Sequence, residues 1–334
     1  MKITSEADVD FYLEAYVGSA ALGAALELGL LWLLAEKPLS AAGIAQELNI
    51  PIKRCRYWLQ ILNNMGLIDQ VPEGYVPSSI AKSAILNTFD QEIWALSARE
   101  ARERFPSMLD LAVHIREPGS TWASQGRTPP DYVSKMVEDP QTARTFTRML
   151  YEVHRNLANQ LALHLDMTGV FRLMDLGGGS GVVSMALLRK HPELTSVVVD
   201  IENVCVVGQE IARENSLADR ITYYAADFLH DELPGEFDMV LVCDVGVFDE
   251  ALFRKLWAAL KLGGRFVIVE HFAPEENVAP PQRLHWAFRD SMVDPDFSVY
   301  TLHQIKEQLS QVGFELLPMD ISLPGGRIVI QARK

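Results

Sequence analysis

The stretch that decides the fold runs from Phe171 to Gly181 and reads FRLMDLGGGSG. An apolar run typical of a buried strand leads into a glycine-rich turn, and VVSMALLRKH then has the pattern of a helix. Such a turn lets backbone approach a ligand closely, and the helix N-terminus offers free N–H groups. The glycines 177, 179 and 181 are spaced as GxGxG, whereas a dinucleotide-binding loop would need Gly or Ala at Val182. A purely structural glycine turn is the alternative.

Strands and helices continue to alternate up to the C-terminus. Further strands are predicted at SVVVD (196–200), ITYYAAD (221–227), FDMVLVCD (237–244) and RFVIVEHF (265–272). FELLPMDI (314–321) and RIVIQARK (327–334) close the chain around a Pro-Gly-Gly turn, so they must pair antiparallel. The pattern predicts a doubly wound α/β sheet with five parallel strands.

Carboxylates end the second and third of these strands. Asp200 follows Gly181 by 19 residues and can accept hydrogen bonds from both hydroxyls of a ribose. Asp227 can meet an adenine amino group while Phe228 packs on the base. Either Asp alone could be a helix cap. Because parallel strands end at one edge of a sheet, the glycine loop and the two carboxylates together indicate a ligand-binding site there.

The N-terminal part reads as mostly helical. Residues 15–35, AYVGSAALGAALELGLLWLLA, are long enough to span a bilayer, but Glu27 and three glycines favour two buried helices, packed within the protein or against a second subunit. Two short helices starting at Ser40 and Pro51, followed by the hairpin GLIDQV–GYVPS, have the pattern of a winged helix. Such a module binds DNA, packs subunits together or supports the other domain of its own chain.

Composition narrows the function further. The 334 residues suggest about two domains, and 44 acidic against 30 basic residues give a net charge of −14, which argues against nucleic acid or an anionic membrane as a partner. The three cysteines lie far apart and no ligand cluster has metal spacing, so no metal site is expected. The N-terminus lacks the layout of a signal peptide, and we expect a cytoplasmic protein.

The runs LMDLGGGSG, VVVDIENV, AADF, FDMVLVCDVGVFDEA and LKLGGRFVIVEHF resemble the class I S-adenosylmethionine-dependent methyltransferases, and more narrowly the small-molecule O-methyltransferases of plants and bacteria. The resemblance implies S-adenosylmethionine as cofactor, a homodimer, and methylation of a small aromatic or polycyclic secondary metabolite. It also implies three parts: a winged-helix dimerisation domain (1–90), a helical linker contributing to the acceptor pocket (91–165), and a seven-stranded, Rossmann-like catalytic domain (166–334).

Roles for single residues follow from the same resemblance. The cofactor site is assigned to the ends of the first four strands, that is, to Gly177, Gly179, Gly181, Asp200, Ile201, Asp227, Phe228, Cys243 and Asp244. The acceptor pocket is assigned to Met149, His154, His285, Trp286 and Arg289. Within these sets the glycines line the amino-acid end of the cofactor, and Cys243 and Asp244 flank its sulfur.

The chain departs from the family where many members carry a general-base histidine after strand four. Here residues 244–249 read DVGVFD. His271 is then the nearest candidate base, with Glu270 as its supporting acid, and His154 and His285 are further candidates. Three cases stay open: a nitrogen or carbon nucleophile, an acceptor hydroxyl already ionised, or a base from elsewhere in the chain.

A second departure is the pair Arg289 and Asp290, at positions where the family has apolar pocket residues. The two could take part in catalysis by binding a polar or carboxylated acceptor, or they could form a surface ion pair. Two rival functions remain. The fold could keep its cofactor for a decarboxylase, hydroxylase or pericyclase reaction, or the winged helix could read DNA through Lys53, Arg54 and Arg56.

Overall fold

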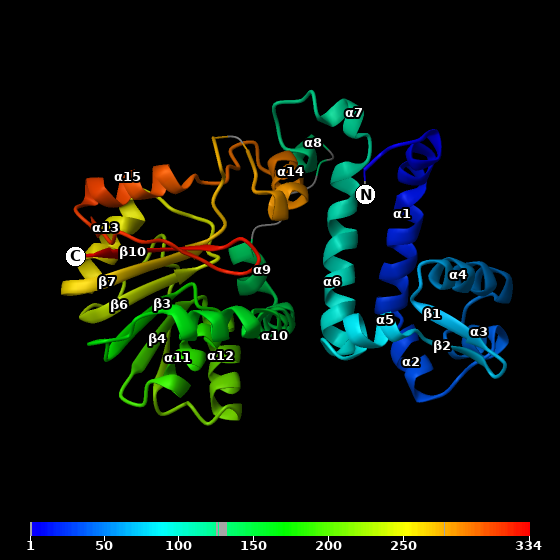
Figure 1. Cartoon of the computed structure of the whole chain (residues 1–334), viewed down its shortest axis with the longest axis horizontal. Helices are drawn as coiled ribbons and strands as arrows, with labels where there is room; N and C mark the ends of the chain where they lie inside the picture. Colours follow the sequence, from blue (N-terminus) through cyan, green and yellow to red (C-terminus); the bar gives the residue numbers. More distant parts are fainter. Residues whose placement is uncertain (1, 125, 127–131, 277) are drawn as a thin grey trace. The chain divides into compact units, whose positions relative to one another are not determined.

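A computed structural model describes residues 2–124, 126, 132–276 and 278–334. The chain divides into two compact units, Met1–Leu109 and Asp110–Lys334 (Figure 1), and each is described by itself.

The first unit is helical with one small hairpin. Its elements are α1 (Glu6–Glu27), α2 (Leu30–Glu36), α3 (Ala41–Glu47), α4 (Ile52–Asn64), β1 (Ile68–Val71), β2 (Gly74–Pro77), α5 (Ser79–Ala81), the π-helix η1 (Lys82–Leu86), α6 (Gln91–Arg104) and the 3-10 helix η2 (Phe105–Met108). The predicted break in the apolar stretch is confirmed, because Gly29, which precedes α2, adopts a φ of 70° and separates α2 from α1. The predicted cap is confirmed as well: the Ser40 hydroxyl accepts a hydrogen bond from the Gly43 N–H at 3.2 Å.

Helix α1 exposes many apolar side chains. Phe11, Leu13 and Tyr16 are 59%, 70% and 56% exposed, while Ala25 and Leu26 face the core of this unit. Among the described residues, no single helix has both the length and the apolar composition of a membrane span; α1 and α2 reach them only together, and the pair is bent by 55° at its break.

The second unit is built on an eight-stranded sheet in the order β5-β4-β3-β6-β7-β10-β8, with β9 also pairing β10. The strands are β3 (Arg172–Leu176), β4 (Thr195–Asp200), β5 (Ile221–Ala225), β6 (Phe237–Cys243), β7 (Leu260–Glu270), β8 (Glu315–Leu316), β9 (Ile321–Ser322) and β10 (Ile328–Arg333). The five predicted parallel strands are confirmed, and so is the antiparallel final strand, in which Ile328 pairs with Glu270.

The single strand predicted over 314–321 is wrong. Residues 317–320 separate β8 from β9, and both short strands pair with β10. Pro318 lies in this gap and has no N–H to donate to a ladder, which accounts for the interruption. The sheet therefore has eight strands where seven were expected.

Helices cover both faces of this sheet (Figure 1). The helices of this unit are α7 (Leu111–His114), α8 (Thr121–Ser124), α9 (Tyr132–Glu138), α10 (Pro140–His164), α11 (Val182–Lys190), α12 (Glu202–Glu214), α13 (Glu250–Ala259), the 3-10 helix η3 (Pro281–Arg283), α14 (Leu284–Val293) and α15 (Leu302–Val312). One buried cluster joins α10, α11 and α12 to the sheet, and a second joins α13 and α15 to its other face. The two cores hold the strands rigidly, so their carboxyl ends form a fixed edge.

Candidate active site

The glycine loop follows β3 and starts α11. Gly177 and Gly179 adopt φ values of 63° and 58°, which side chains rarely tolerate. A Cβ on Gly177 would lie 2.7 Å from Val245 Cγ2 and 3.6 Å from Phe228 Cε1, so the loop packs tightly on one side. A Cβ on Gly179 would meet nothing within 4 Å. The loop is thus held against its neighbours at Gly177 and open at Gly179.

Asp200 lies beside this loop at the end of β4. Its Oδ2 accepts the Gly179 N–H and its Oδ1 accepts the Ile201 N–H, both at 2.8 Å. Asp200 is 6% exposed, and burial raises its pKa to about 6 although the two N–H groups favour the carboxylate. Each carboxylate oxygen keeps a second acceptor position, so the group can still receive two hydroxyl donors.

Asp227 and Phe228 follow β5. The hydrogen bond with His230 Nδ1, at 2.7 Å from Asp227 Oδ2, is the main reason that the pKa of Asp227 falls below its ordinary value. Asp227 therefore stays ionised at neutral pH. His230 lies three residues downstream of Asp227, at the turn after the strand, and its side chain is 78% exposed, as its place in a predicted loop suggests.

Asp244 is held in an unexpected network at the end of β6. The Nε of Arg327 lies 2.9 Å from both Asp244 carboxylate oxygens, and His154 Nε2 lies 3.5 Å from Oδ2. Burial raises the pKa of Asp244, but the hydrogen bonds with His154 and Arg327 outweigh it and hold this pKa well below its usual range. Cys243, directly before it, has a thiol whose pKa is raised well above normal by burial. Arg327 was missed because it lies 83 residues away; its place at the start of the last predicted strand was the available signal.

The candidate bases His154 and His271 are poorly placed to take a proton from an acceptor hydroxyl. His154 presents Nε2 to Asp244 and Nδ1 to the Leu150 carbonyl oxygen at 3.1 Å, so both ring nitrogens face acceptors. His271 is 5% exposed, and burial, followed by the charges of Arg283 and Arg327, lowers its pKa to about 4. Its Nδ1 is buried with no hydrogen-bond partner among the described residues. His271 is thus a weaker base than the sequence suggested.

The pKa of Glu270 shifts in the opposite direction to that of His271. Burial, and then the charge of Asp244, raises its pKa to about 7. Its Oε1 accepts the N–H of His271 at 2.8 Å, and Arg283 and Arg327 act in the other direction by favouring the carboxylate. A carboxyl group with a pKa near 7 can exchange a proton at neutral pH.

The predicted acceptor-pocket residues on α14 differ in their exposure and in their partners. The Nε of Arg289 lies 2.8 Å from Oδ1 of Asp290, with both side chains 28% exposed, so these two residues pair with each other. His285 is exposed. Trp286 is half-buried, and its ring centroid lies 5.0 Å from that of Phe297. Within the described residues, no group of three His, Cys, Asp or Glu side chains is arranged to hold a metal ion.

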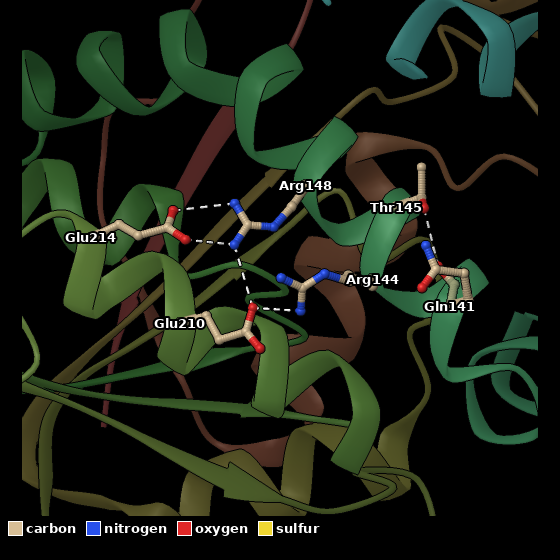
Figure 2. Close-up of polar contacts among 6 residues, drawn as sticks. All are labelled: Gln141, Arg144, Thr145, Arg148, Glu210 and Glu214. Atoms are coloured by element: carbon tan, nitrogen blue, oxygen red, sulfur yellow. Dashed lines mark hydrogen bonds and ion pairs between the residues drawn. The ribbon is translucent and has the colours of Figure 1, made fainter.

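Helix α10, which carries the half-buried Met149 as well as His154, is fastened to α12 by ion pairs (Figure 2). Arg148 lies 2.6 Å from Glu214 and 3.3 Å from Glu210, and Arg144 lies 2.6 Å from Glu210. Because α12 begins two residues after Asp200, this network fixes α10 relative to the edge of the sheet.

Comparison with known proteins gives consistent matches. The family model for the O-methyltransferase domain matches residues 110–315. The chain is 30% identical over 264 residues to 3-hydroxy-5-methyl-1-naphthoate 3-O-methyltransferase of Streptomyces sahachiroi, covering 78% of this chain and 75% of the relative. It is 24% identical over 306 residues to the N,N-dimethyltransferase OxyT of Streptomyces rimosus, covering 90% and 88%.

Among solved structures, that of PigF with SAH superposes with a TM-score of 0.85 at 18% identity, covering 99% of this chain and 100% of the other. At that identity the likeness shows the fold. The architecture, a helical N-terminal region followed by a mixed α/β sheet, is thus shared along the whole chain.

Proposed function

Since the chain belongs to the O-methyltransferase family of S-adenosylmethionine-dependent enzymes, we propose that it methylates a hydroxyl group on a small aromatic or polycyclic metabolite. The acceptor class is supported by the relative that acts on a hydroxynaphthoate. The relative that is an N,N-dimethyltransferase makes nitrogen the alternative acceptor atom. The observation that carries the choice of a hydroxyl is Glu270, a carboxyl group with a pKa of about 7 at the same sheet edge as the glycine loop.

The residues at this edge fit S-adenosylmethionine. Asp200 has spare acceptor positions for ribose hydroxyls, and the ionised Asp227 can accept from an adenine amino group beside the ring of Phe228. The open side of Gly179 leaves room for the amino-acid end. When bound, this cofactor supplies an electrophilic methyl group on a sulfonium sulfur.

Glu270 would hold the proton that the acceptor hydroxyl loses. Its carboxylate form is supported by Arg283 and Arg327 and opposed by burial and by Asp244, which keeps the two protonation states close in energy near pH 7. His271 orients this carboxylate through its N–H. Most of the remaining rate enhancement in such a displacement comes from positioning, which the ion pairs of α10 and the buried strands support.

The proposed partners are the small acceptor and a second copy of the chain, with neither nucleic acid nor membrane. Burying the exposed apolar side chains of α1, such as Leu13, would favour a homodimer through the 1–90 winged-helix part. Lys53, Arg54 and Arg56 are exposed on α4, but the net charge of −14 opposes DNA binding. The three cysteines are free thiols, as a reducing cytoplasm would keep them.

The test is to incubate the purified protein with methyl-labelled S-adenosylmethionine and a panel of hydroxylated and amino-substituted naphthalenes and anthraquinones. Mass spectrometry then follows S-adenosylhomocysteine and the methylated product. We expect labelled methyl ethers. Products methylated only on nitrogen or carbon would overturn the choice of a hydroxyl. Calorimetry provides the control: Asp200→Ala should lose S-adenosylmethionine binding while remaining folded at the assay temperature, although its melting temperature falls because two backbone N–H groups lose their acceptor.

A further inference from the structure

Arg283 is a half-buried cation without a carboxylate partner in the described part of the chain. It ends the short helix η3 and its guanidinium carbon lies 5.1 Å from the centroid of the Trp286 ring. Two other arginines nearby along the chain or in space are neutralised, Arg289 by Asp290 and Arg327 by Asp244. The charge of Arg283 is therefore available to a ligand.

The register of the sheet places Arg283 near the carboxyl end of β7. Ile328 of β10 pairs with Glu270, the last residue of β7, and Gly326 lies just before that pair. Gln282 packs against Gly326, where an added Cβ would lie 3.0 Å from the Gln282 side chain. Arg283 follows directly, and its charge acts on both Glu270 and His271.

The surroundings of Arg283 select the kind of ligand. The guanidinium carbon of Arg283 lies over the Trp286 ring, and the planar pair of N–H donors that an arginine carries matches the two oxygens of a carboxylate. Apolar and aromatic side chains lie close by on α14, where Leu284 and Phe288 are 55% and 41% exposed. A flat aromatic acid would satisfy both the cation and these apolar groups.

We propose that Arg283 recognises a carboxylate on the aromatic acceptor and thereby makes the enzyme selective for aromatic hydroxy acids. This inference rests on the proposed function and narrows it. The acid group pairs with Arg283 while the hydroxyl to be methylated is presented to Glu270. Arg283 is then a specificity-determining residue, and Glu270 keeps its part in the chemistry.

The test compares 3-hydroxy-2-naphthoate with its methyl ester. Binding of each to the protein saturated with S-adenosylhomocysteine is followed by ligand fluorescence, and methyl transfer to each is measured separately. We expect the acid to bind about tenfold or more tightly than the ester, and Arg283→Gln to abolish that preference. Arg283→Lys should keep part of this preference for the acid, because lysine retains the positive charge but lacks the paired N–H donors of the guanidinium. Arg254→Gln is the matched control, since that arginine pairs with Glu250 on α13 in an exposed position.

The outcomes separate the two proposals. Equal binding of acid and ester to the wild-type protein, or a preference that persists in Arg283→Gln, overturns the role of Arg283, while labelled ethers from both compounds leave the proposed function standing. If no hydroxylated compound in either experiment is bound or methylated, both proposals fail. Should Arg283→Gln not fold, as judged by its melting temperature, the wild-type comparison and Arg283→Lys decide the matter.

Discussion

Arg327 binds Asp244 through a two-pronged ion pair that joins the residue just before β10 to the residue just after β6. Its Nε lies 2.9 Å from both carboxylate oxygens, and its Nη2 lies 2.8 Å from Oδ2. Both side chains are less than one-fifth exposed, at 18% and 15%. The pair fastens the turn before β10 to the edge where the cofactor site is proposed.

We expect Arg327→Ala to lower the free energy of unfolding by about 2–3 kcal/mol, because it leaves the Asp244 carboxylate half-buried without its main partner. Urea denaturation at pH 7 measures this loss. Since the pKa of Asp244 is lowered by folding, its contribution is present above the unfolded pKa of about 3.9 and disappears as the pH falls through the lower folded value. The difference in unfolding free energy between wild type and Asp244→Asn should therefore be smaller at pH 3 than at pH 7. A difference that does not change with pH would contradict the lowered pKa of Asp244.

The raised pKa of Asp200 predicts that cofactor binding depends on pH. Its pKa of about 6 in the free protein means that the carboxylate is mostly ionised at pH 7 and mostly protonated at pH 5. If the ionised form holds the ribose, the dissociation constant for S-adenosylhomocysteine should rise about tenfold over that range. Calorimetry at several pH values measures it. Asp200→Asn should bind weakly with little pH dependence; an unchanged slope in this variant would point to Asp175, whose pKa is also about 6.

The local part of this site could be predicted from the sequence. The glycine loop and Asp200 lie together, and the hydrogen bond from Gly179 to Asp200 joins them. Glycine turns and strand ends carry their information in a few adjacent residues, and the parallel topology brings those ends to one edge. The same reasoning found the antiparallel final strand but not the break caused by Pro318.

The electrostatic part could not be predicted in this way. Arg327 and Asp244 are 83 residues apart, and they come together because both β6 and β10 pair with β7. Burial reverses the expected order of the two candidates at the end of β7, since it makes His271 a weaker base and Glu270 a stronger one. Burial at a strand end depends on what packs over it, which no short motif records.

Glu270 should govern the pH profile of methyl transfer. We expect kcat/KM to rise as the pH increases through about 7 and then to level off, because only the carboxylate accepts a proton. Glu270→Gln should lower the rate at pH 7 by about 10² to 10⁴ and remove this rise, with the affinity for S-adenosylmethionine unchanged. Glu275→Gln, an exposed neighbour, is the control. A variant Glu270→Gln with the wild-type profile would exclude Glu270 as the base.

The ion pairs between α10 and α12 make a smaller contribution (Figure 2). Arg148→Ala should cost about 0.5–1 kcal/mol of unfolding free energy, because Glu214 is 54% exposed and solvent screens the pair. High salt should reduce the difference from wild type. Arg155→Ala is the matched control, since Arg155 pairs with Glu152 inside α10 and is 61% exposed. Urea denaturation at low and high salt measures both variants, and equal losses for the two would show that the link to α12 is energetically unimportant.

The apolar surface of α1 predicts the oligomeric state. Leu13 is 70% exposed, and Tyr16, three residues on along the same face of α1, is 56% exposed; burying such apolar surface favours association by up to about 1.5–3 kcal/mol for each side chain. We therefore expect a dimer in light scattering coupled to size-exclusion chromatography. Leu13→Asp should shift the protein towards the monomer mass, because an unpaired carboxylate is costly in an apolar interface. Leu262→Asp is the matched control: Leu262 is 92% exposed in the other unit and should leave the mass unchanged. A wild-type monomer, or a dimer that Leu13→Asp does not weaken, would show that α1 is not the interface.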